Sequence, residues 1–313
     1  MADTELDVFQ LCLGGNVFGW SIEEQRSFEV LDAYVAAGGN FIDTADSYGR
    51  RGPGGAGESE RIIGRWMAAR GNREQLVIAT KVGMSAELPG LSRATIRRGI
   101  EASLERLGIE TVDLYYAHRD DRDTPLQETL GAFSQLIDEG RIRYAAASNY
   151  RAERLEEALR LGQQDGMASY VALQPHYNLV ERREYESELR PLCERHGLAC
   201  LPYFGLARGF LTGKYQRDGP EIDSPRAAGV HDAYFNERGF AVLDVLRDLA
   251  TAHDTAVAAV AAVALAWLLA QPTVLTPIAS ATSTAQLAEL VACVDLQLTP
   301  GELERLDAAS AGG

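Results

Sequence analysis

Eight short apolar runs alternate with helix-like segments along this chain of 313 residues. Alternating strands and helices are typical of a parallel sheet, because two parallel strands need a crossover connection between them. Eight such units predict an α/β fold of the (β/α)8 TIM-barrel type. The expected strands are Phe9–Gly14, Phe41–Asp43, Leu76–Lys81, Val112–His118, Ile142–Ser148, Val171–Gln174, Leu198–Tyr203 and Val274–Ile278.

An open, doubly wound sheet is the alternative for the same alternation. Such a sheet usually carries a G-x-G-x-x-G turn after its first strand, where a phosphate group binds. The corresponding turn here is GGNVFG, from Gly14 to Gly19, which lacks that spacing. The closed barrel is therefore favoured. Because no linker divides the chain, we expect a single domain over residues 1–313.

Capping patterns mark several helix starts. The sequences SIEE from Ser21 and TPLQ from Thr124 are interpreted as capping boxes, and Ser92 as an N-cap. The stretch Phe204–Phe235 contains prolines and glycines without helical periodicity, and we expect it to be irregular. The expected helices cover residues 21–37, 58–70, 92–107, 124–140, 151–162, 185–196, 237–253, 256–269, 284–291 and 300–310.

Charge and targeting signals exclude several classes of protein. The formal net charge is −15, whereas a nucleic-acid binder needs a positive surface against phosphates. The stretch Thr255–Pro272 is apolar but rich in alanine, and we expect a buried barrel helix there rather than a membrane span. The first residues lack the basic and apolar regions of a secretory signal. A cytoplasmic protein with no membrane and no nucleic-acid partner is expected.

The cysteines support the same compartment. None of them forms a C-x-x-C pair, so we expect buried thiols in a reducing environment and no zinc site. They are Cys12, Cys193, Cys200 and Cys293.

Four polar side chains lie at or just after the ends of three successive strands: Asp43, Tyr48, Lys81 and His118. Lys81 follows Asp43 by 38 residues, and His118 follows Lys81 by 37. A strand with its crossover helix and loops takes roughly 30 residues or more, so these positions recur once per unit. We therefore expect the four side chains to meet at the carboxyl end of the barrel, where barrel enzymes hold their catalytic groups.

This combination of side chains is suited to proton transfer. A phenol has an ordinary pKa of about 10, and a nearby ammonium group lowers it. We expect Lys81 to lower the pKa of Tyr48 and Asp43 to supply the counter-charge of Lys81. His118 is expected to hold a substrate oxygen or to share the proton. Singly, a loop tyrosine is usually a packing residue and a strand-end lysine is usually solvated, but the combination favours general acid catalysis.

These segments resemble the aldo-keto reductase family over nearly the whole chain. NFIDTADSYG, followed by GESERIIGRWM, is similar to the first family signature; VIATKVG contains the family lysine, and LYYAHRDD the family histidine. The resemblance implies that Asp43, Tyr48, Lys81 and His118 form the catalytic tetrad. It also implies NADPH-dependent reduction of an aldehyde or ketone, with NADH as a possible cofactor. In this reaction the nicotinamide gives the hydride and Tyr48 gives the proton.

The resemblance extends to a cofactor site after the later strands, in the segments ASNY, LQPHYNLVER, LPYFGLARGFLTGKY and IASATSTAQLAEL. It implies that Ser148, Asn149 and Gln174 hydrogen-bond the nicotinamide carboxamide and that Tyr203 stacks on the ring. It implies that groups around Leu206, Gly209 and Lys214 hold the pyrophosphate. The adenosine half is assigned to Ser280, Thr282, Gln286 and Glu289.

Two positions depart from the family pattern. Many members have an arginine at the position of Thr282, where it pairs with the 2′-phosphate of NADPH, and a hydroxyl is a weaker partner for that group. The usual serine-proline after the stacking tyrosine is replaced by Phe204-Gly205, which can alter the path of the loop over the cofactor.

Two other functions remain open. The first is a regulatory barrel that binds a nicotinamide cofactor without physiological turnover. The second is a metal-dependent hydrolase or isomerase using His118, Asp120, Asp121 and His176, although we expect no metal because the resemblance gives His118 another role. The loops that set specificity have no decisive pattern, so the sequence names neither an individual carbonyl substrate nor an oligomeric state.

Overall fold

The sheet consists of eight parallel strands in the order β7-β6-β5-β4-β3-β2-β1-β8. The computed structural model describes residues 4–217, 219, 222, 227–253 and 259–312. The strands are β1 (Cys12–Gly14), β2 (Phe41–Asp43), β3 (Val77–Val82), β4 (Val112–Ala117), β5 (Ile142–Ser148), β6 (Tyr170–Gln174), β7 (Ala199–Cys200) and β8 (Ile278–Ala279). Each strand from β1 to β6 pairs with the next one in the chain, which makes the open, doubly wound alternative wrong.

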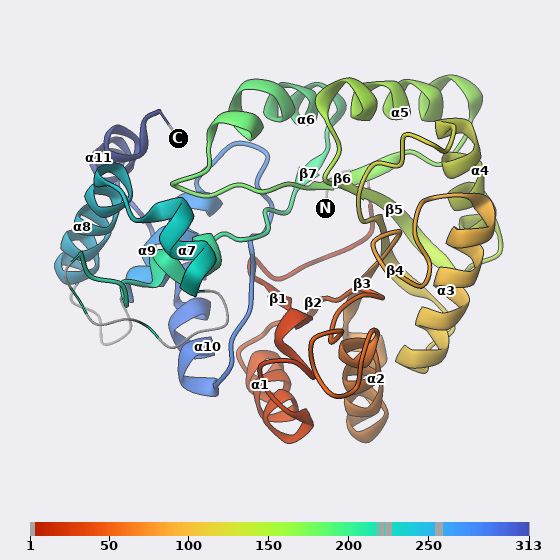
Figure 1. Cartoon of the computed structure of the whole chain (residues 1–313), viewed down its shortest axis with the longest axis horizontal. Helices are drawn as coiled ribbons and strands as arrows, with labels where there is room; N and C mark the ends of the chain where they lie inside the picture. The colour runs from red at the N-terminus through yellow and green to blue at the C-terminus, as the bar shows by residue number, and fades with distance from the viewer. Residues whose placement is uncertain (1–3, 218, 220–221, 223–226, 254–258, 313) are drawn as a thin grey trace.

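β7 and β8, the two ends of this strand order, are connected through the segment before β8. The Cys200 amide donates to the Thr273 carbonyl at 2.8 Å, and the Ile278 amide donates to the Pro202 carbonyl at 2.9 Å. On the other side, β8 pairs in parallel with β1. The eight strands therefore curl into the (β/α)8 fold that the sequence predicted (Figure 1). The last strand was expected from Val274, but regular pairing is confined to Ile278–Ala279.

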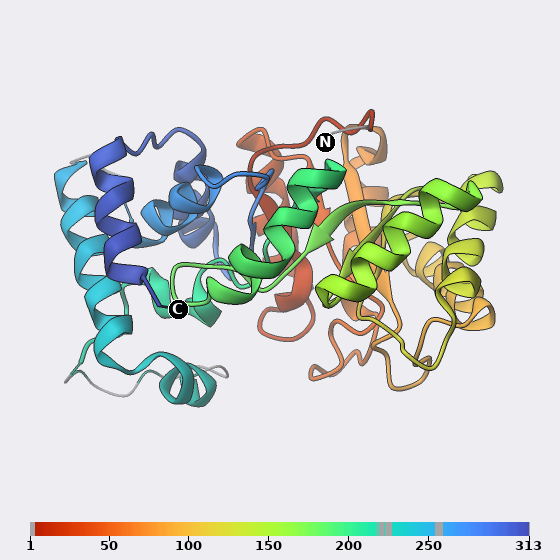
Figure 2. The same cartoon turned by 90° about the horizontal axis from the view of Figure 1, so that it is seen from above.

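Helices surround the sheet and follow the strands in the chain. They are α1 (Glu24–Ala36), α2 (Glu58–Arg70), α3 (Arg93–Leu107), α4 (Leu126–Asp138), α5 (Ala152–Asp165), α6 (Arg190–His196), α7 (Ala227–Tyr234), α8 (Glu237–Ala252), α9 (Val260–Leu269), α10 (Thr284–Val291) and α11 (Pro300–Ser310). Figures 1 and 2 show α8, α9 and α11 together at one end of the molecule, away from α3 and α4.

The predicted caps were right at one helix and wrong at two. The Ser92 hydroxyl accepts from the Thr95 amide at 3.2 Å and caps α3 as expected. The expected capping boxes at Ser21 and Thr124 do not form, because α1 begins after Glu23 and α4 after Pro125. The Thr124 hydroxyl donates instead to Asp121, at 2.7 Å.

The stretch Phe204–Phe235 is more regular than the sequence predicted. It contains a 3₁₀ segment, Ala207–Thr212, and helix α7, with part of the stretch outside the described residues. Val230 and Tyr234 of α7 are buried, and the Tyr234 ring lies 5.7 Å from that of Phe210. Tertiary packing therefore stabilises α7, a helix that the local periodicity of the sequence does not predict.

The core has one layer inside the barrel and a second layer between the sheet and the helices. Adjacent residues of β4 separate these layers: Tyr116 lies in the inner cluster and Tyr115 in the outer one. All four cysteines are buried free thiols, as predicted. Ala261 to Leu268 of α9 are buried, while the expected start of that helix at Ala256 lies outside the described residues. Among the described residues, none of the helices combines the length and the apolar character needed to span a membrane.

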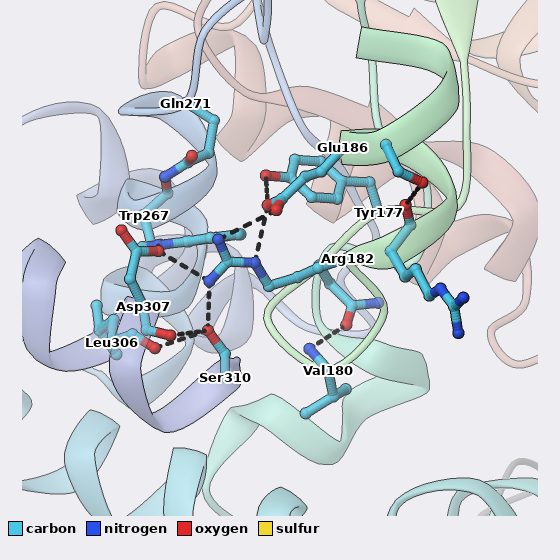
Figure 3. Close-up of polar contacts among 12 residues, drawn as sticks. Tyr177, Val180, Arg182, Glu186, Trp267, Gln271, Leu306, Asp307 and Ser310 are labelled. Atoms are coloured by element: carbon cyan, nitrogen blue, oxygen red, sulfur yellow. Dashed lines mark hydrogen bonds and ion pairs between the residues drawn. The ribbon is translucent and has the colours of Figure 1, made fainter. Parts of the chain in front are cut away.

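Arg182 connects the loop after β6 to the C-terminal helix (Figure 3). Its guanidinium donates to Glu186 at 2.8 Å and to Asp307 and Ser310 of α11 at 2.9 and 2.6 Å. It also lies 5.0 Å from the centre of the Trp267 ring of α9. This Arg182 network places α9 and α11 against the part of the chain that leads from β6 into α6.

Candidate active site

Lys81 is the centre of the predicted tetrad and is completely buried. It lies on β3, in which all six residues are buried, and its side chain points into the barrel. Its ammonium group donates to Asp43 Oδ2 at 2.6 Å, to the Thr44 carbonyl at 2.7 Å and to the Tyr48 hydroxyl at 3.2 Å. An ammonium group has three donors, so all of them are in use and the side chain has a fixed orientation.

The counter-charge expected for Lys81 is therefore present in Asp43. Burial, the largest single influence, acts to lower the pKa of Lys81, but the charges of Asp43 and Tyr48 and their hydrogen bonds together outweigh it, and the pKa is raised above its ordinary value. Lys81 stays positively charged at neutral pH. The Thr44 carbonyl was missed in the sequence, because a backbone acceptor leaves no trace in residue type.

The Tyr48 hydroxyl accepts a hydrogen bond from Lys81, which leaves its own proton available for donation. Burial raises the pKa of Tyr48 above its ordinary value, although the charge of Lys81 acts in the opposite direction. Lys81 therefore acts on the pKa of Tyr48 in the expected direction, but the expected net lowering is wrong because burial has the larger effect. The sequence shows the neighbouring ammonium group but not the loss of water around the phenol.

His118 completes the tetrad at the end of β4. Its ring lies 6.1 Å from the Tyr48 ring, at 77° to it. His118 Nδ1 is buried without a hydrogen-bond partner among the described residues. Burial lowers the pKa of His118 far below its ordinary value, and the charges of Lys81 and of nearby arginines lower it further. The ring is therefore neutral at pH 7, and one nitrogen remains free for a ligand.

A second layer of amides lies beside the tetrad. Gln174 Nε2 donates to Asp43 Oδ1 at 3.0 Å, so one residue of the predicted cofactor set contacts the tetrad directly. The Ser148 hydroxyl donates to the Gln174 carbonyl at 2.9 Å. Asn149 Nδ2 donates to the His118 carbonyl at 2.8 Å, and Asn149 Oδ1 accepts from the Tyr203 hydroxyl at 2.8 Å. These bonds connect the ends of β4, β5 and β6 into one network.

Aromatic rings cover the side of this network formed after β6 and β7. The Tyr203 ring stacks on that of His176, with centres 5.4 Å apart and an interplanar angle of 15°. The Phe204 ring packs edge-on against both. Burial lowers the pKa of His176 to about 4, so this imidazole is a neutral stacking partner at pH 7. From the sequence His176 was only a possible metal ligand, because its packing against Tyr203 leaves no signal in residue type.

The segment expected to hold a pyrophosphate has an unusual backbone. Ala207, Arg208 and Gly209 have positive φ angles of 47°, 59° and 97°. Successive left-handed residues turn backbone N–H groups toward one side, and such turns bind anions. Phe204 also has a positive φ, 54°, and its carbonyl accepts from Asn178 at 2.9 Å. The departure from serine-proline at this point therefore coincides with a strained turn.

Close to this turn, the side chain of Lys214 lies against Gly209. A Cβ atom at Gly209 would lie 3.5 Å from Lys214 Nζ, so the ammonium group lies directly over the glycine. Leu206 is the first residue of this turn and lies at the start of the 3₁₀ segment. The three predicted pyrophosphate residues are thus brought together.

The residues predicted for the adenosine half surround the start of α10. Ser280 donates to Asn16 Oδ1 at 2.6 Å, which connects β8 to the loop after β1. Thr282 donates to Gln286 Oε1 through its amide and its hydroxyl, at 2.9 and 2.8 Å. Glu289 is exposed on α10 and takes no part in these hydrogen bonds of Ser280, Thr282 and Gln286. Asn16 was missed, because an isolated asparagine in a loop has no distinguishing pattern.

The metal alternative has no support in the part of the chain that the structure describes, where no group of three or more histidine, cysteine, aspartate or glutamate residues could hold a metal ion. His118 and His176 take part in the tetrad and the aromatic stack instead. Asp120 pairs with Arg154 at 3.2 Å, and Asp121 accepts from the Leu91 amide at 2.7 Å.

Comparison with known proteins agrees with this architecture. The aldo/keto reductase family model matches residues 10–311, and the chain belongs to this family. A probable voltage-gated potassium channel subunit beta of Oryza sativa subsp. japonica is 33% identical, over 97% of this chain and 93% of that protein. The uncharacterized oxidoreductase YrpG of Bacillus subtilis is 32% identical over the same shares. Norsolorinic acid reductase B of Dothistroma septosporum is 29% identical, over 96% of this chain and 78% of that protein.

The family and its oxidoreductase relatives define the class of activity. The chain is an NAD(P)H-dependent oxidoreductase of the aldo-keto reductase type. Carbonyl reduction is the reaction that this class performs, and a nicotinamide nucleotide is its cofactor.

Proposed function

We propose that this protein reduces an aldehyde or ketone to an alcohol with NADPH, using Tyr48 as the proton donor. The observation that supports this most directly is the partly buried contact of 3.2 Å between the Lys81 ammonium group and the Tyr48 hydroxyl. A phenol that accepts from a cation can release its own proton, because the phenolate left behind is stabilised by the same bond.

Each member of the tetrad has a role in this proposal. Lys81 stabilises the charge that develops on Tyr48, and Asp43 keeps Lys81 protonated and in place. His118 offers the carbonyl oxygen a hydrogen bond from a neutral ring, since its pKa is far below 7. In a site closed to water these electrostatic contributions are stronger than in solution.

The amides and the backbone turn fit a nicotinamide nucleotide. When bound, this cofactor supplies the hydride to the carbonyl carbon. Asn149 contacts the His118 carbonyl and Gln174 contacts Asp43, so these two residues would hold the carboxamide of the cofactor next to the tetrad. Ser148 supports Gln174, and Tyr203 offers a ring for stacking. The turn at Ala207–Gly209, with Leu206 and Lys214, fits a pyrophosphate.

The adenosine half is assigned to Ser280, Thr282, Gln286 and Glu289. The Thr282–Gln286 contact at the start of α10 offers polar atoms near a helix N-terminus, where a phosphate group is favoured. We propose NADPH as the preferred cofactor, with NADH as the alternative.

A spectrophotometric assay tests the reaction. We expect NADPH absorbance to fall on addition of 4-nitrobenzaldehyde and to fall equally fast with a metal chelator present. A rate abolished by chelator would indicate a metal-dependent enzyme. No oxidation with a panel of aldehydes and ketones would reject the reductase function.

The second candidate is a regulatory barrel that binds the nucleotide without physiological turnover. It is favoured by the similarity to probable potassium channel subunits beta, which are 33% identical in two plants. A single-turnover experiment separates the two candidates. With a carbonyl substrate and excess NADPH, a reductase oxidises many equivalents of NADPH per protein molecule. A regulatory barrel of this kind stops after oxidising about one equivalent.

We also propose a cytoplasmic location and a single-domain organisation. Four buried free thiols fit a cytoplasmic protein, because thiols persist in a reducing compartment. A single barrel domain with a small-molecule carbonyl substrate fits the position of the tetrad at the strand ends. Gel filtration and partial proteolysis test the domain proposal, since a single domain resists cleavage as one unit.

A further inference from the structure

A second set of buried polar groups lies behind the tetrad, between the sheet and helices α2 and α3. Thr80 belongs to it: its hydroxyl donates to Glu60 on α2, whereas the next residue, Lys81, points into the barrel. The Asp46 residue is 6% exposed, and its neighbours Thr80 on β3 and Glu60 on α2 are 3% exposed or less. The members of this cluster, called the Asp46 cluster below, are Asp46, Glu60, Thr80, Arg106 and Tyr115.

The charges in this region do not balance without Asp46 taking up a proton. Glu60 Oε2 accepts from Arg106 Nε at 2.6 Å, and Asp43 pairs with Lys81 at 2.6 Å. Each nearby cation therefore already has its own carboxylate. Among the described residues, both carboxyl oxygens of Asp46 are buried without a hydrogen-bond partner, and so is the Tyr115 hydroxyl.

An unpaired carboxylate in such surroundings is strongly unfavourable, and the group takes up a proton instead. Burial, and then the charge of Glu60, raise the pKa of Asp46 to about 7, against the opposing charges of Arg106 and Lys81. The charged and titratable groups that face it are thus Glu60 on α2, Arg106 on α3, Lys81 on β3 and Tyr115 on β4.

Asp46 stands in the chain between two members of the tetrad. It follows Asp43 by three positions and precedes Tyr48 by two. Its amide donates to the Lys81 carbonyl at 3.3 Å, and the Tyr48 amide donates to the Ala45 carbonyl at 3.1 Å. The segment is short and buried, so a movement of Asp46 toward water displaces Tyr48 relative to Lys81.

We propose that Asp46 is a positioning residue that, as a neutral carboxylic acid within the Asp46 cluster, holds the 43–48 segment where Lys81 contacts Tyr48. Ionisation leaves a buried charge beside Glu60 and drives the segment toward solvent. Activity then falls with Asp46 ionisation, without Asp46 touching the substrate. The inference rests on the proposed reductase function for its kinetic readout only.

The pH profile of kcat tests this inference, because Tyr48, Lys81 and His118 have pKa values away from 7. The pKa of Tyr48 and that of Lys81 are raised above their ordinary values, and the pKa of His118 is far below 7. We expect wild-type kcat to fall by up to about tenfold per pH unit above pH 7. Asp46→Asn, neutral at every pH, retains most of the kcat at pH 6 and loses this alkaline decline.

Asp113→Asn is the matched control. Asp113 is also buried, but it pairs with Arg73 at 2.8 Å and with Arg143 at 3.1 Å, far from the 43–48 segment in the chain. We expect this variant to keep the wild-type pH profile. An Asp46→Asn profile that still declines above pH 7 would overturn the inference.

Infrared difference spectroscopy supplies a readout that does not depend on activity. We expect a neutral carboxylic acid band in the wild type at pH 6 that disappears by pH 9 and is missing from Asp46→Asn. A wild type without this band at pH 6 would overturn the inference. A protein that titrates as expected but reduces no carbonyl instead rejects the reductase function.

Discussion

Tyr48 is the residue whose change should separate chemistry from binding. Tyr48→Phe removes one hydroxyl and keeps the ring, so the 6.1 Å packing against His118 is retained. We expect kcat for aldehyde reduction to fall by about 10²–10⁴-fold, the usual contribution of a general acid. The dissociation constant of NADPH, measured by fluorescence quenching, should change little. A variant that reduces 4-nitrobenzaldehyde at the wild-type rate would show that Tyr48 is not the acid.

Thr282 is the residue that should set the choice of nucleotide. Its hydroxyl and amide both contact Gln286, and it carries no charge. Thr282→Arg adds a guanidinium that can bind a 2′-phosphate in a bidentate manner. We expect NADPH to bind about tenfold more tightly while NADH affinity stays the same, since charge-assisted bonds contribute roughly 1.5–3 kcal/mol.

Thr282→Gln is the control, because it has similar size without the charge. Equal gains in NADPH affinity for both variants, measured by titration calorimetry, would contradict this role of charge.

At the residue scale, side-chain type and spacing predicted contacts better than they predicted environments. The contact between Lys81 and Asp43 followed from strand-end positions. The direction of the Tyr48 pKa did not, because the degree of burial depends on residues from the whole barrel. Asp46 lies inside the segment NFIDTADSYG, but the sequence does not show that it lacks a cation partner. That follows only from the fold, in which Arg106 pairs with Glu60 instead.

At the scale of elements, the start of α3 offers a matched test of helix capping. Ser92 accepts from the Thr95 amide at 3.2 Å, whereas Ser21, which the sequence also predicted to be a cap, lies outside α1 and is exposed. We expect Ser92→Ala to lower the free energy of unfolding by about 1 kcal/mol. Ser21→Ala should change it by less than about 0.5 kcal/mol in urea denaturation. Equal effects would contradict the cap assignment.

Sequence patterns predicted the elements that depend on local sequence, but not those that depend on distant segments. The strand-helix alternation gave the order of units, since each unit is local in sequence. Helix α7 and the closing contact between Cys200 and Thr273 were not predicted, because both depend on segments that meet only after folding. The capping box at Thr124 failed for a related reason: Asp121 competes for its hydroxyl.

At the scale of the whole molecule, the Arg182 network connects the end of the chain to the barrel. The guanidinium side chain is only 16% exposed, and its loss leaves Glu186 and Asp307 without a cation. We expect Arg182→Met to lower the free energy of unfolding by about 3 kcal/mol. Arg195→Met removes an exposed pair with Glu156, and should cost less than about 1 kcal/mol. Similar losses for both variants would show that the network does not hold α11 in place.

The pH dependence of global stability is the last property expected to follow from one buried group. The pKa of Asp46 is about 7 in the folded protein, above its ordinary value of 3.8. A raised folded pKa means that the native state binds more protons than the unfolded state between these two values. The stability contributed by the neutral carboxyl is therefore complete below about pH 4 and is lost as the pH rises through 7.

Comparison with Asp46→Asn isolates this contribution, because all other titrating groups cancel. We expect the free energy of unfolding of the wild type to decline relative to the variant by roughly 1.4 kcal/mol per pH unit between pH 4 and 7. Above pH 7 the difference should become constant. A difference that is independent of pH across this interval, measured by urea denaturation, would mean that Asp46 is already ionised in the folded barrel and that a cation or water compensates it.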